Sequence, residues 1–169
     1  VHRMAAALDG QIELVCGAFS SDAEKSLLSG KELYLSPNRI YANYQEMIEK
    51  ERHMDADLRM DLVSIVTPNH VHFGPAKLAI QNGFHVICDK PLTYNLEEAY
   101  ELQKLVKNAD RIFALTHNYT GYPMVKQARQ MVKLGDLGKI RKVVVEYPQG
   151  WLSTLLEASD QKQASWRTD

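Results

Sequence analysis

The sequence has almost no excess of charge of either sign. Its 169 residues include 20 lysines and arginines against 21 aspartates and glutamates, which gives a formal net charge of −1. A protein that holds a nucleic-acid backbone needs a surplus of basic side chains, so this balance argues against a nucleic-acid partner. The chain also has no apolar run near the roughly 20 residues of a membrane helix. We therefore expect neither a nucleic acid nor a membrane as a partner.

Cysteine is equally scarce. Cys16 and Cys88 are the only two, and each lies in a short apolar run that is typical of a strand. Two thiols cannot build a disulfide framework, so we expect buried, reduced thiols and a cytoplasmic protein. The hydrophobic share of 45% and the charged share of 24% are typical of a folded globular chain rather than a disordered one.

Both ends lack the features of a complete protein. The chain starts at Val1, within a stretch that resembles the end of a helix, and it stops after Trp166-Arg167-Thr168-Asp169 without a closing element. The first residues do not form a secretory signal. We expect the sequence to be an internal piece of a longer chain.

Apolar runs of strand type alternate with helical patterns along the chain. The strand-like runs are Ile12–Phe19, Leu62–Val66, His85–Cys88, Ile112–Leu115 and Ile140–Tyr147. Helices are expected from a cap at Ser21 to about Ser29, over Asn43–Glu51, over Phe73–Ile80, from a cap at Asn95, and from Pro123 to about Leu134. This alternation predicts an α/β fold, a Rossmann-like parallel sheet with helices on both faces. Ligands of such sheets bind at the carboxyl ends of the strands, so a site is expected in the turns that follow them.

The turn after the Leu62–Val66 run has the sequence Thr67-Pro68-Asn69-His70-Val71-His72. Its amide and imidazole side chains stand beside a helix N-terminus, where phosphate and other polar groups are favoured. The same residues are also compatible with a simple loop and helix cap. A metal site at His70 and His72 is not favoured, because no third ligand lies nearby in the sequence.

Asp89-Lys90-Pro91 follows the His85–Cys88 run. A lysine at the mouth of a sheet can donate a hydrogen bond to a substrate oxygen and take part in acid–base chemistry, while a neighbouring aspartate fixes its side chain. The alternative is a strand-end ion pair beside a turn proline. Thr116-His117-Asn118-Tyr119 follows the next strand, and its Asn118 is a candidate ligand-facing amide.

The order of these motifs resembles the Gfo/Idh/MocA family (glucose–fructose oxidoreductase, inositol dehydrogenase and rhizopine-catabolism proteins). The family pattern T-P-N-x-x-H followed by E-K-P is similar to the segments from Thr67 to His72 and from Asp89 to Pro91. The resemblance continues through Asn118, the Gly135-Asp136-Leu137-Gly138 turn and Trp166-Arg167, and so covers nearly the whole chain. It implies a dinucleotide-binding Rossmann domain over residues 1–120. Residues 121–169 would then be the start of an α+β domain that has an open sheet and binds the substrate.

The same resemblance implies one catalytic residue and a set of cofactor contacts. Asp89 and Lys90 would both lie beside the nicotinamide ribose, with Lys90 reaching the reacting hydroxyl. The further residues implied to line the cofactor are Thr67, Pro68, Asn69, His72, Asn118, Trp166 and Arg167. Asp89 is one methylene shorter than the Glu of the family pattern, which changes its reach.

Two family motifs do not occur in the sequence. The glycine motif G-x-G-x-x-G brings the backbone against the pyrophosphate, and we expect it upstream of Val1. The catalytic Asp-x-x-x-His stretch is expected beyond Asp169. We therefore expect this piece alone to be a poor catalyst.

The choice between NADP and NAD depends on the turn Phe19-Ser20-Ser21, with Lys25 one helical turn later. Two hydroxyls, a helix N-terminus and a lysine suit a 2′-phosphate, so we predict a preference for NADP. Asp22 could bind the ribose hydroxyls instead, which leaves NAD open.

The implied function is an NAD(P)-dependent oxidoreductase that transfers a hydride to or from a sugar, cyclitol or related polyol. The alternative is a non-catalytic NAD(P)-binding sensor or regulatory protein of the same fold. A third possibility is a lyase or glycosidase that reduces and reoxidises its cofactor within one cycle. The resemblance also implies a homo-oligomer when the protein is complete, because the sheets of the family often pair face to face. Without its neighbouring strands, the Ile140–Tyr147 strand would be an exposed apolar edge that is prone to association.

Overall fold

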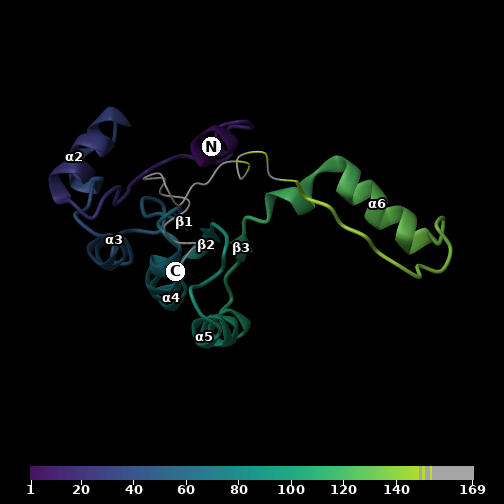
Figure 1. The fold of residues 1–169 in the computed structure, drawn as a ribbon. Helices are drawn as coiled ribbons and strands as arrows, with labels where there is room; N and C mark the ends of the chain where they lie inside the picture. The colour runs from purple at the N-terminus through teal and green to yellow at the C-terminus, as the bar shows by residue number, and fades with distance from the viewer. Residues whose placement is uncertain (149, 151–152, 154–169) are drawn as a thin grey trace. The chain divides into compact units, whose positions relative to one another are not determined.

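The computed structural model describes residues 1–148, 150 and 153. The chain divides after Tyr122 into two compact units, Val1–Tyr122 and Pro123–Asp169. The first unit contains the strands found among the described residues and helices α1 to α5, while α6 belongs to the second (Figure 1). That the second unit begins an α+β substrate domain stays a prediction.

Three parallel strands form the sheet, in the order β1-β2-β3. They are β1 (Leu62–Ile65), β2 (His85–Cys88) and β3 (Phe113–Leu115). Ile65 lies opposite Cys88, and Cys88 lies opposite Leu115 on the next strand. The structure therefore confirms an α/β fold with a Rossmann-like parallel sheet.

Helices α4 (Phe73–Gln81) and α5 (Leu96–Asn108) connect these strands. The strands follow one another across the sheet in one direction, so right-handed crossovers place both helices on the same face, as Figure 1 shows. In β1, Val63 and Ile65 are buried but Ser64 between them is exposed. Helix α1 (His2–Ala6) approaches this other face, since His2 Nδ1 lies 3.5 Å from Ser64 Oγ. That helices cover both faces of the sheet stays a prediction.

Most helix ends follow the side chains that the sequence places there. Asn43 caps α3 (Tyr44–Glu51), and Asn95 caps α5 by accepting a hydrogen bond from the backbone amide of Glu98. Helix α4 ends before Gly83, which has a φ of +83° that glycine adopts without strain. The remaining helices are α1 (His2–Ala6) and α6 (Pro123–Leu134).

Helix α2 (Ala23–Glu32) begins and ends later than predicted. Asp22, not Ser21, is the cap, and its Oδ1 accepts from the backbone amides of Glu24 and Lys25 at 3.0 and 3.2 Å. A carboxylate is favoured at this position because its charge also complements the positive end of the helix dipole.

Gly30 lies buried inside α2. A Cβ at this position would lie 2.6 Å from side-chain carbons of Ile40. The absence of a side chain therefore lets the helix backbone approach Ile40 directly.

The predicted strand over Ile12–Phe19 is reduced to one parallel bridge, between Gly17 and Ile40. The amide of Gly17 donates to the carbonyl of Arg39 at 3.1 Å, and the amide of Tyr41 donates to the carbonyl of Gly17 at 2.9 Å. A strand needs a continuous neighbour, and among the described residues this run has only that short one. The strand prediction is therefore wrong for these residues.

The predicted strand over Ile140–Tyr147 is also absent from the structure. Its β-branched residues favour extended backbone. No strand pairs with them among the described residues, so the prediction failed for lack of a partner rather than for lack of propensity.

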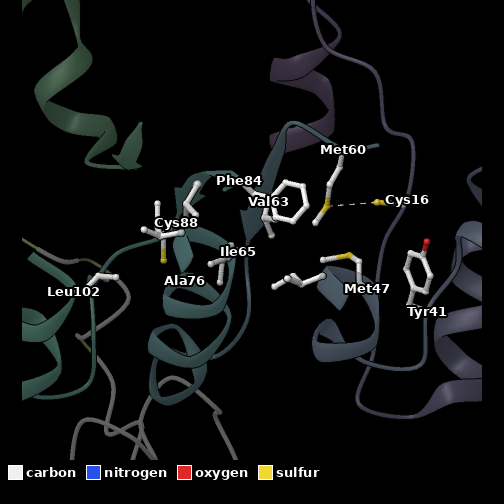
Figure 2. Close-up of a cluster of buried hydrophobic side chains, with 14 residues drawn as sticks. Cys16, Tyr41, Met47, Met60, Val63, Ile65, Ala76, Phe84, Cys88 and Leu102 are labelled. Atoms are coloured by element: carbon white, nitrogen blue, oxygen red, sulfur yellow. Dashed lines mark hydrogen bonds between the residues drawn. The ribbon is translucent and has the colours of Figure 1, made fainter. Parts of the chain in front are cut away.

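The core lies between β1, β2, α3 and α4, with Leu102 of α5 at its edge (Figure 2). Its buried hydrophobic members are Cys16, Tyr41, Met47, Ile48, Met60, Val63, Ile65, Ala76, Ala79, Ile80, Phe84, Val86, Cys88 and Leu102. Figure 2 shows the Cys16 thiol directed toward the sulfur of Met60, at 3.7 Å. No helix in the described part of the chain has both the length and the apolarity to cross a membrane.

A buried carboxylate joins α3 to the segments beside it. The side chain of Glu51 is fully buried and accepts two hydrogen bonds from Arg39 at 2.8 Å, one on each oxygen. The Tyr41 hydroxyl donates to it at 2.6 Å, and the Met60 amide donates at 2.9 Å. A buried charge is tolerated only with such full pairing, so the cluster fixes how residues 39–41 and Met60 meet α3.

Candidate functional site

The carboxyl ends of the strands bring the predicted turns side by side. The amide of Asp89 donates to the carbonyl of Ile65 at 3.0 Å, and the amide of Thr116 donates to the carbonyl of Cys88 at 2.9 Å. These bonds continue the ladders one residue beyond β2 and β3. The turns that begin at Thr67, Asp89 and Thr116 therefore start together at one edge of the sheet.

His72 connects the first two turns. Its side chain is buried, its Nδ1 lies 2.7 Å from the carbonyl oxygen of Pro91, and its Nε2 lies 2.9 Å from that of Thr67. Both ring nitrogens are therefore occupied by backbone carbonyls. Direct contact of His72 with a cofactor stays a prediction, whereas its observed contacts fix the distance between the two turns.

Asp89 has a half-buried carboxylate with two neighbours on one oxygen. Thr116 Oγ1 donates to Oδ1 at 2.6 Å, and His2 Nε2 of α1 lies 3.0 Å from the same atom. The Asp89 side chain keeps 39% of its surface exposed. Among the described residues, nothing forms a hydrogen bond with its Oδ2, so this oxygen is available to a ligand.

Lys90 is exposed, directly after Asp89. Within the described part of the chain its ammonium group takes part in no hydrogen bond or ion pair, so the alternative of a strand-end ion pair with Asp89 is not formed there. The peptide bond between Lys90 and Pro91 is cis. Lys90 therefore offers a free cation beside a carboxylate whose orientation is fixed by other residues.

The other predicted contacts in these turns are more exposed than His72. Thr67 and Pro68 are exposed, and Asn69 is half-buried at the start of the short helix η2 (Asn69–Val71). Asn118 is exposed at the start of η3 (Asn118–Gly121), just beyond β3. The edge thus presents amide, hydroxyl, carboxylate and ammonium groups toward solvent.

The turn that was predicted to choose the cofactor is organised around Ser26. The hydroxyl of this fully buried residue accepts from the Phe19 amide at 3.0 Å and donates to the Tyr41 carbonyl at 2.7 Å. Ser26 was not a predicted site residue, since a serine inside a helix gives no sequence signal for such a contact.

Ser20, Ser21 and Lys25 lie around the start of α2. Ser20 Oγ accepts from the amide of Asp22 at 3.1 Å, whereas Ser21 and Lys25 are exposed. The capping bonds occupy Oδ1 of Asp22, and Lys25 Nζ lies 4.0 Å from Oδ2. Binding of a ribose by Asp22 would therefore compete with its role as a cap.

Two predicted residues, Trp166 and Arg167, lie outside the described residues. Thr116 is the functional neighbour that sequence reasoning missed, although it stands in the quoted Thr116-His117-Asn118-Tyr119 segment. In the described residues, no group of three or more His, Cys, Asp or Glu side chains is placed to hold a metal ion. Burial raises the pKa of the Cys88 thiol to about 11, with the charge of Asp89 adding to the rise, so this thiol is a poor nucleophile.

The family model of the Gfo/Idh/MocA oxidoreductases, described as an oxidoreductase family with an NAD-binding Rossmann fold, matches residues 2–117. The chain belongs to this family. The parallel sheet and the turns at its carboxyl edge are thus those of an NAD(P)-binding Rossmann domain.

Relatives of this family member extend well beyond its length. An uncharacterized oxidoreductase of Bacillus subtilis, YfiI, is 34% identical over 99% of this chain and 42% of its own. An inositol dehydrogenase homolog from Azotobacter vinelandii, solved in complex with NAD⁺, is 36% identical with a TM-score of 0.88 over 99% of this chain and 42% of its own. An oxidoreductase from Sinorhizobium meliloti is 51% identical with a TM-score of 0.79 over 83% of this chain and 39% of its own. The chain therefore spans about two fifths of the length of these relatives.

The groups at the sheet edge fit one end of a nicotinamide dinucleotide. The available oxygen of Asp89 suits a ribose hydroxyl, and the exposed amide of Asn118 suits a carboxamide. The described residues do not include the glycine-rich turn that holds a pyrophosphate. The groups at the sheet edge therefore suit the nicotinamide riboside portion of the dinucleotide.

Proposed function

We propose that this chain forms the cofactor-binding part of an NAD(P)-dependent dehydrogenase that acts on a sugar, cyclitol or related polyol. The observation that carries the proposal is the free, exposed Lys90 next to the oriented carboxylate of Asp89, at the carboxyl edge of a family Rossmann sheet. The relatives support the substrate class. One solved homolog holds NADH and myo-inositol, and another relative is a levoglucosan dehydrogenase.

The residues of this chain would divide the chemistry between them. A bound nicotinamide supplies the hydride acceptor or donor. Lys90 would hydrogen-bond the reacting hydroxyl of the polyol and help move its proton, while Asp89 would hold a ribose hydroxyl. His72 would keep the Thr67 and Pro91 turns at a fixed separation, so that these groups stay oriented toward one ligand.

Replacement of Lys90 tests this function. In the longest natural polypeptide that contains this sequence, Lys90→Ala should lower kcat by about 100-fold, because proton transfer and hydroxyl binding are lost. Dinucleotide affinity should change little. The measurement is steady-state turnover with a panel of polyols, beginning with myo-inositol, alongside a titration of cofactor fluorescence.

Lys104→Ala is the matched control, since this lysine is exposed on α5 and away from the carboxyl edge. It should stay within about two-fold of the parent, as surface substitutions usually do. Normal turnover in the Lys90 variant would remove Lys90 from catalysis. Cofactor binding without turnover of any polyol would favour the sensor alternative.

We also propose that the protein prefers NADP. In support, Asp22 caps α2, while Ser21 and Lys25 remain exposed beside the helix N-terminus, where they suit a 2′-phosphate. NADPH should then bind about tenfold more tightly than NADH, which corresponds to one charge-assisted contact. Lys25→Gln should reduce this ratio. A tenfold preference for NADH would contradict the proposal. The buried free thiols of Cys16 and Cys88 support a reducing compartment such as the cytoplasm.

A further inference from the structure

We propose that Thr116 is a positioning residue that orients Asp89 toward a ribose hydroxyl of the cofactor. The proposal rests on the proposed function and adds a residue to its site. The observation is the 2.6 Å hydrogen bond from Thr116 Oγ1 to Asp89 Oδ1, which joins the ends of two neighbouring strands. Nothing in the family pattern quoted above identifies this threonine.

Both partners of this bond are anchored through their backbone. The amide of Thr116 donates to the carbonyl of Cys88, the residue before Asp89. The amide of Asp89 donates in turn to the carbonyl of Ile65 on β1. The two side chains therefore start from atoms whose separation the sheet itself determines. Their hydrogen bond needs no adjustment of a loop.

The bond leaves one carboxylate oxygen for a ligand. A threonine hydroxyl has one proton, and here it is given to Oδ1. Since His2 Nε2 also lies beside Oδ1, both protein neighbours are on the same oxygen. Oδ2 can then accept from a diol, and the side chain loses little rotational freedom when the ligand binds.

The short aspartate makes this anchor useful. A glutamate has one more rotatable bond, so a single hydrogen bond would leave its carboxylate with more freedom. For Asp89, with two side-chain torsions, one contact at Oδ1 determines where Oδ2 points. Thr116 thus fixes the direction of the Asp89 carboxylate. This compensates for the methylene that Asp89 lacks relative to the Glu of the E-K-P pattern.

A double-mutant cycle tests the proposal in the longest natural polypeptide that contains this sequence. The variants are Thr116→Val, which keeps the shape but removes the donor, Asp89→Ala, which removes the acceptor, and the two combined. The readout is the Kd for NADH and for NADPH, measured by fluorescence titration, together with kcat and KM for a polyol. Thr116→Val should weaken dinucleotide binding by about tenfold, as expected for loss of a hydrogen bond to a charged group. It should change Kd more than kcat.

The combined variant distinguishes positioning from a general loss of structure. If Thr116 acts through Asp89, Thr116→Val should cause no further loss in the Asp89→Ala background, where the hydroxyl has no carboxylate to orient. Thr116→Ser keeps the hydroxyl and should restore the parent Kd to within about two-fold. Thr120→Val is the matched control, because it removes a 2.7 Å hydrogen bond to the His117 carbonyl without touching Asp89.

Three results would overturn the inference. An unchanged Kd in Thr116→Val would show that the bond does not orient the site. Equal losses in the parent and Asp89→Ala backgrounds would show a purely structural effect, as would an equal loss in Thr120→Val. If the parent itself binds neither dinucleotide, the proposed function fails, whereas normal binding by both the parent and Thr116→Val removes only the role of Thr116.

Discussion

Burial controls the chemistry of individual side chains in this protein. It raises the pKa of the Cys16 thiol from 9.0 to about 12, with the nearby charge of Glu51 adding to the rise. Burial also raises the pKa of the Cys88 thiol, to about 11. Both thiols therefore stay protonated at neutral pH. This agrees with the expectation of two buried, reduced cysteines.

The raised thiol pKa values predict a loss of stability at alkaline pH. Because the folded pKa of Cys16 lies above its unfolded value, the native state holds more protons than the unfolded state between pH 9 and about 12. The free energy of unfolding should thus be unaffected by this group below pH 9. It should then fall by up to about 1.4 kcal/mol per pH unit as the pH rises. Urea unfolding at pH 8, 9 and 10 measures the slope.

Cys16→Ala isolates the contribution of this thiol to the pH dependence of the free energy of unfolding. This variant loses stability at every pH because it removes buried volume, but its slope above pH 9 should be smaller. Equal slopes in the parent and the variant would show that Cys16 does not contribute.

The elements show which parts of the fold a sequence can predict. Strands β1 to β3 and the caps at Asn43 and Asn95 follow from local patterns, because short apolar runs and capping side chains act within a few residues. The Ile12–Phe19 and Ile140–Tyr147 runs have the same propensities but no complete strand partner among the described residues. Strand formation depends on that distant partner, which no local pattern reveals.

The candidate site divides in the same way. The turns at the strand ends could be predicted, since parallel connections place them at one edge. The hydrogen bond from Thr116 to Asp89 could not be predicted, because it depends on the register between β2 and β3. The burial of His72 between two carbonyls also needs the turns to be positioned in space.

The cap of α5 gives a prediction at this scale. Asn95 accepts from the Glu98 amide at 2.9 Å, and Glu98 Oε2 accepts in return from the Tyr94 amide at 3.3 Å. Asn95→Ala should lower the free energy of unfolding by about 1 kcal/mol, since a helix amide loses its partner. Asn108→Ala makes the same chemical change at the other end of α5 and should be neutral or slightly stabilising. Equal urea midpoints for the two variants would contradict the role of the cap.

At the scale of the whole molecule, the second unit exposes apolar side chains. Val143 is 75% exposed, Val144 66% and Val145 82%. Monomeric proteins rarely expose contiguous residues of this kind, and unpaired extended segments of apolar sequence tend to associate. Because the chain spans about two fifths of its relatives' length, either further strands of the same polypeptide or a second copy could cover these side chains, and the homo-oligomer stays a prediction.

Self-association through this segment can be measured directly. Val143→Lys combined with Val145→Lys should shift the protein toward the monomer in sedimentation velocity, because charges on the segment oppose pairing. Gln130→Lys adds a charge at an exposed position of α6 and should leave the distribution unchanged. A parent protein that is monomeric at all concentrations would contradict the prediction.

The contact between Gly30 and Ile40 has a consequence for engineering. Replacing a glycine inside a helix by alanine is a common route to thermostability, worth about 1 kcal/mol from helix propensity alone. At Gly30 the added methyl group would meet Ile40 carbons at 2.6 Å. Either the Ile40 side chain or helix α2 would have to move, and a movement of the helix would displace Ser26, which anchors the turn at Phe19. Substitutions chosen by helix propensity alone therefore put the turn proposed to choose the cofactor at risk at this position.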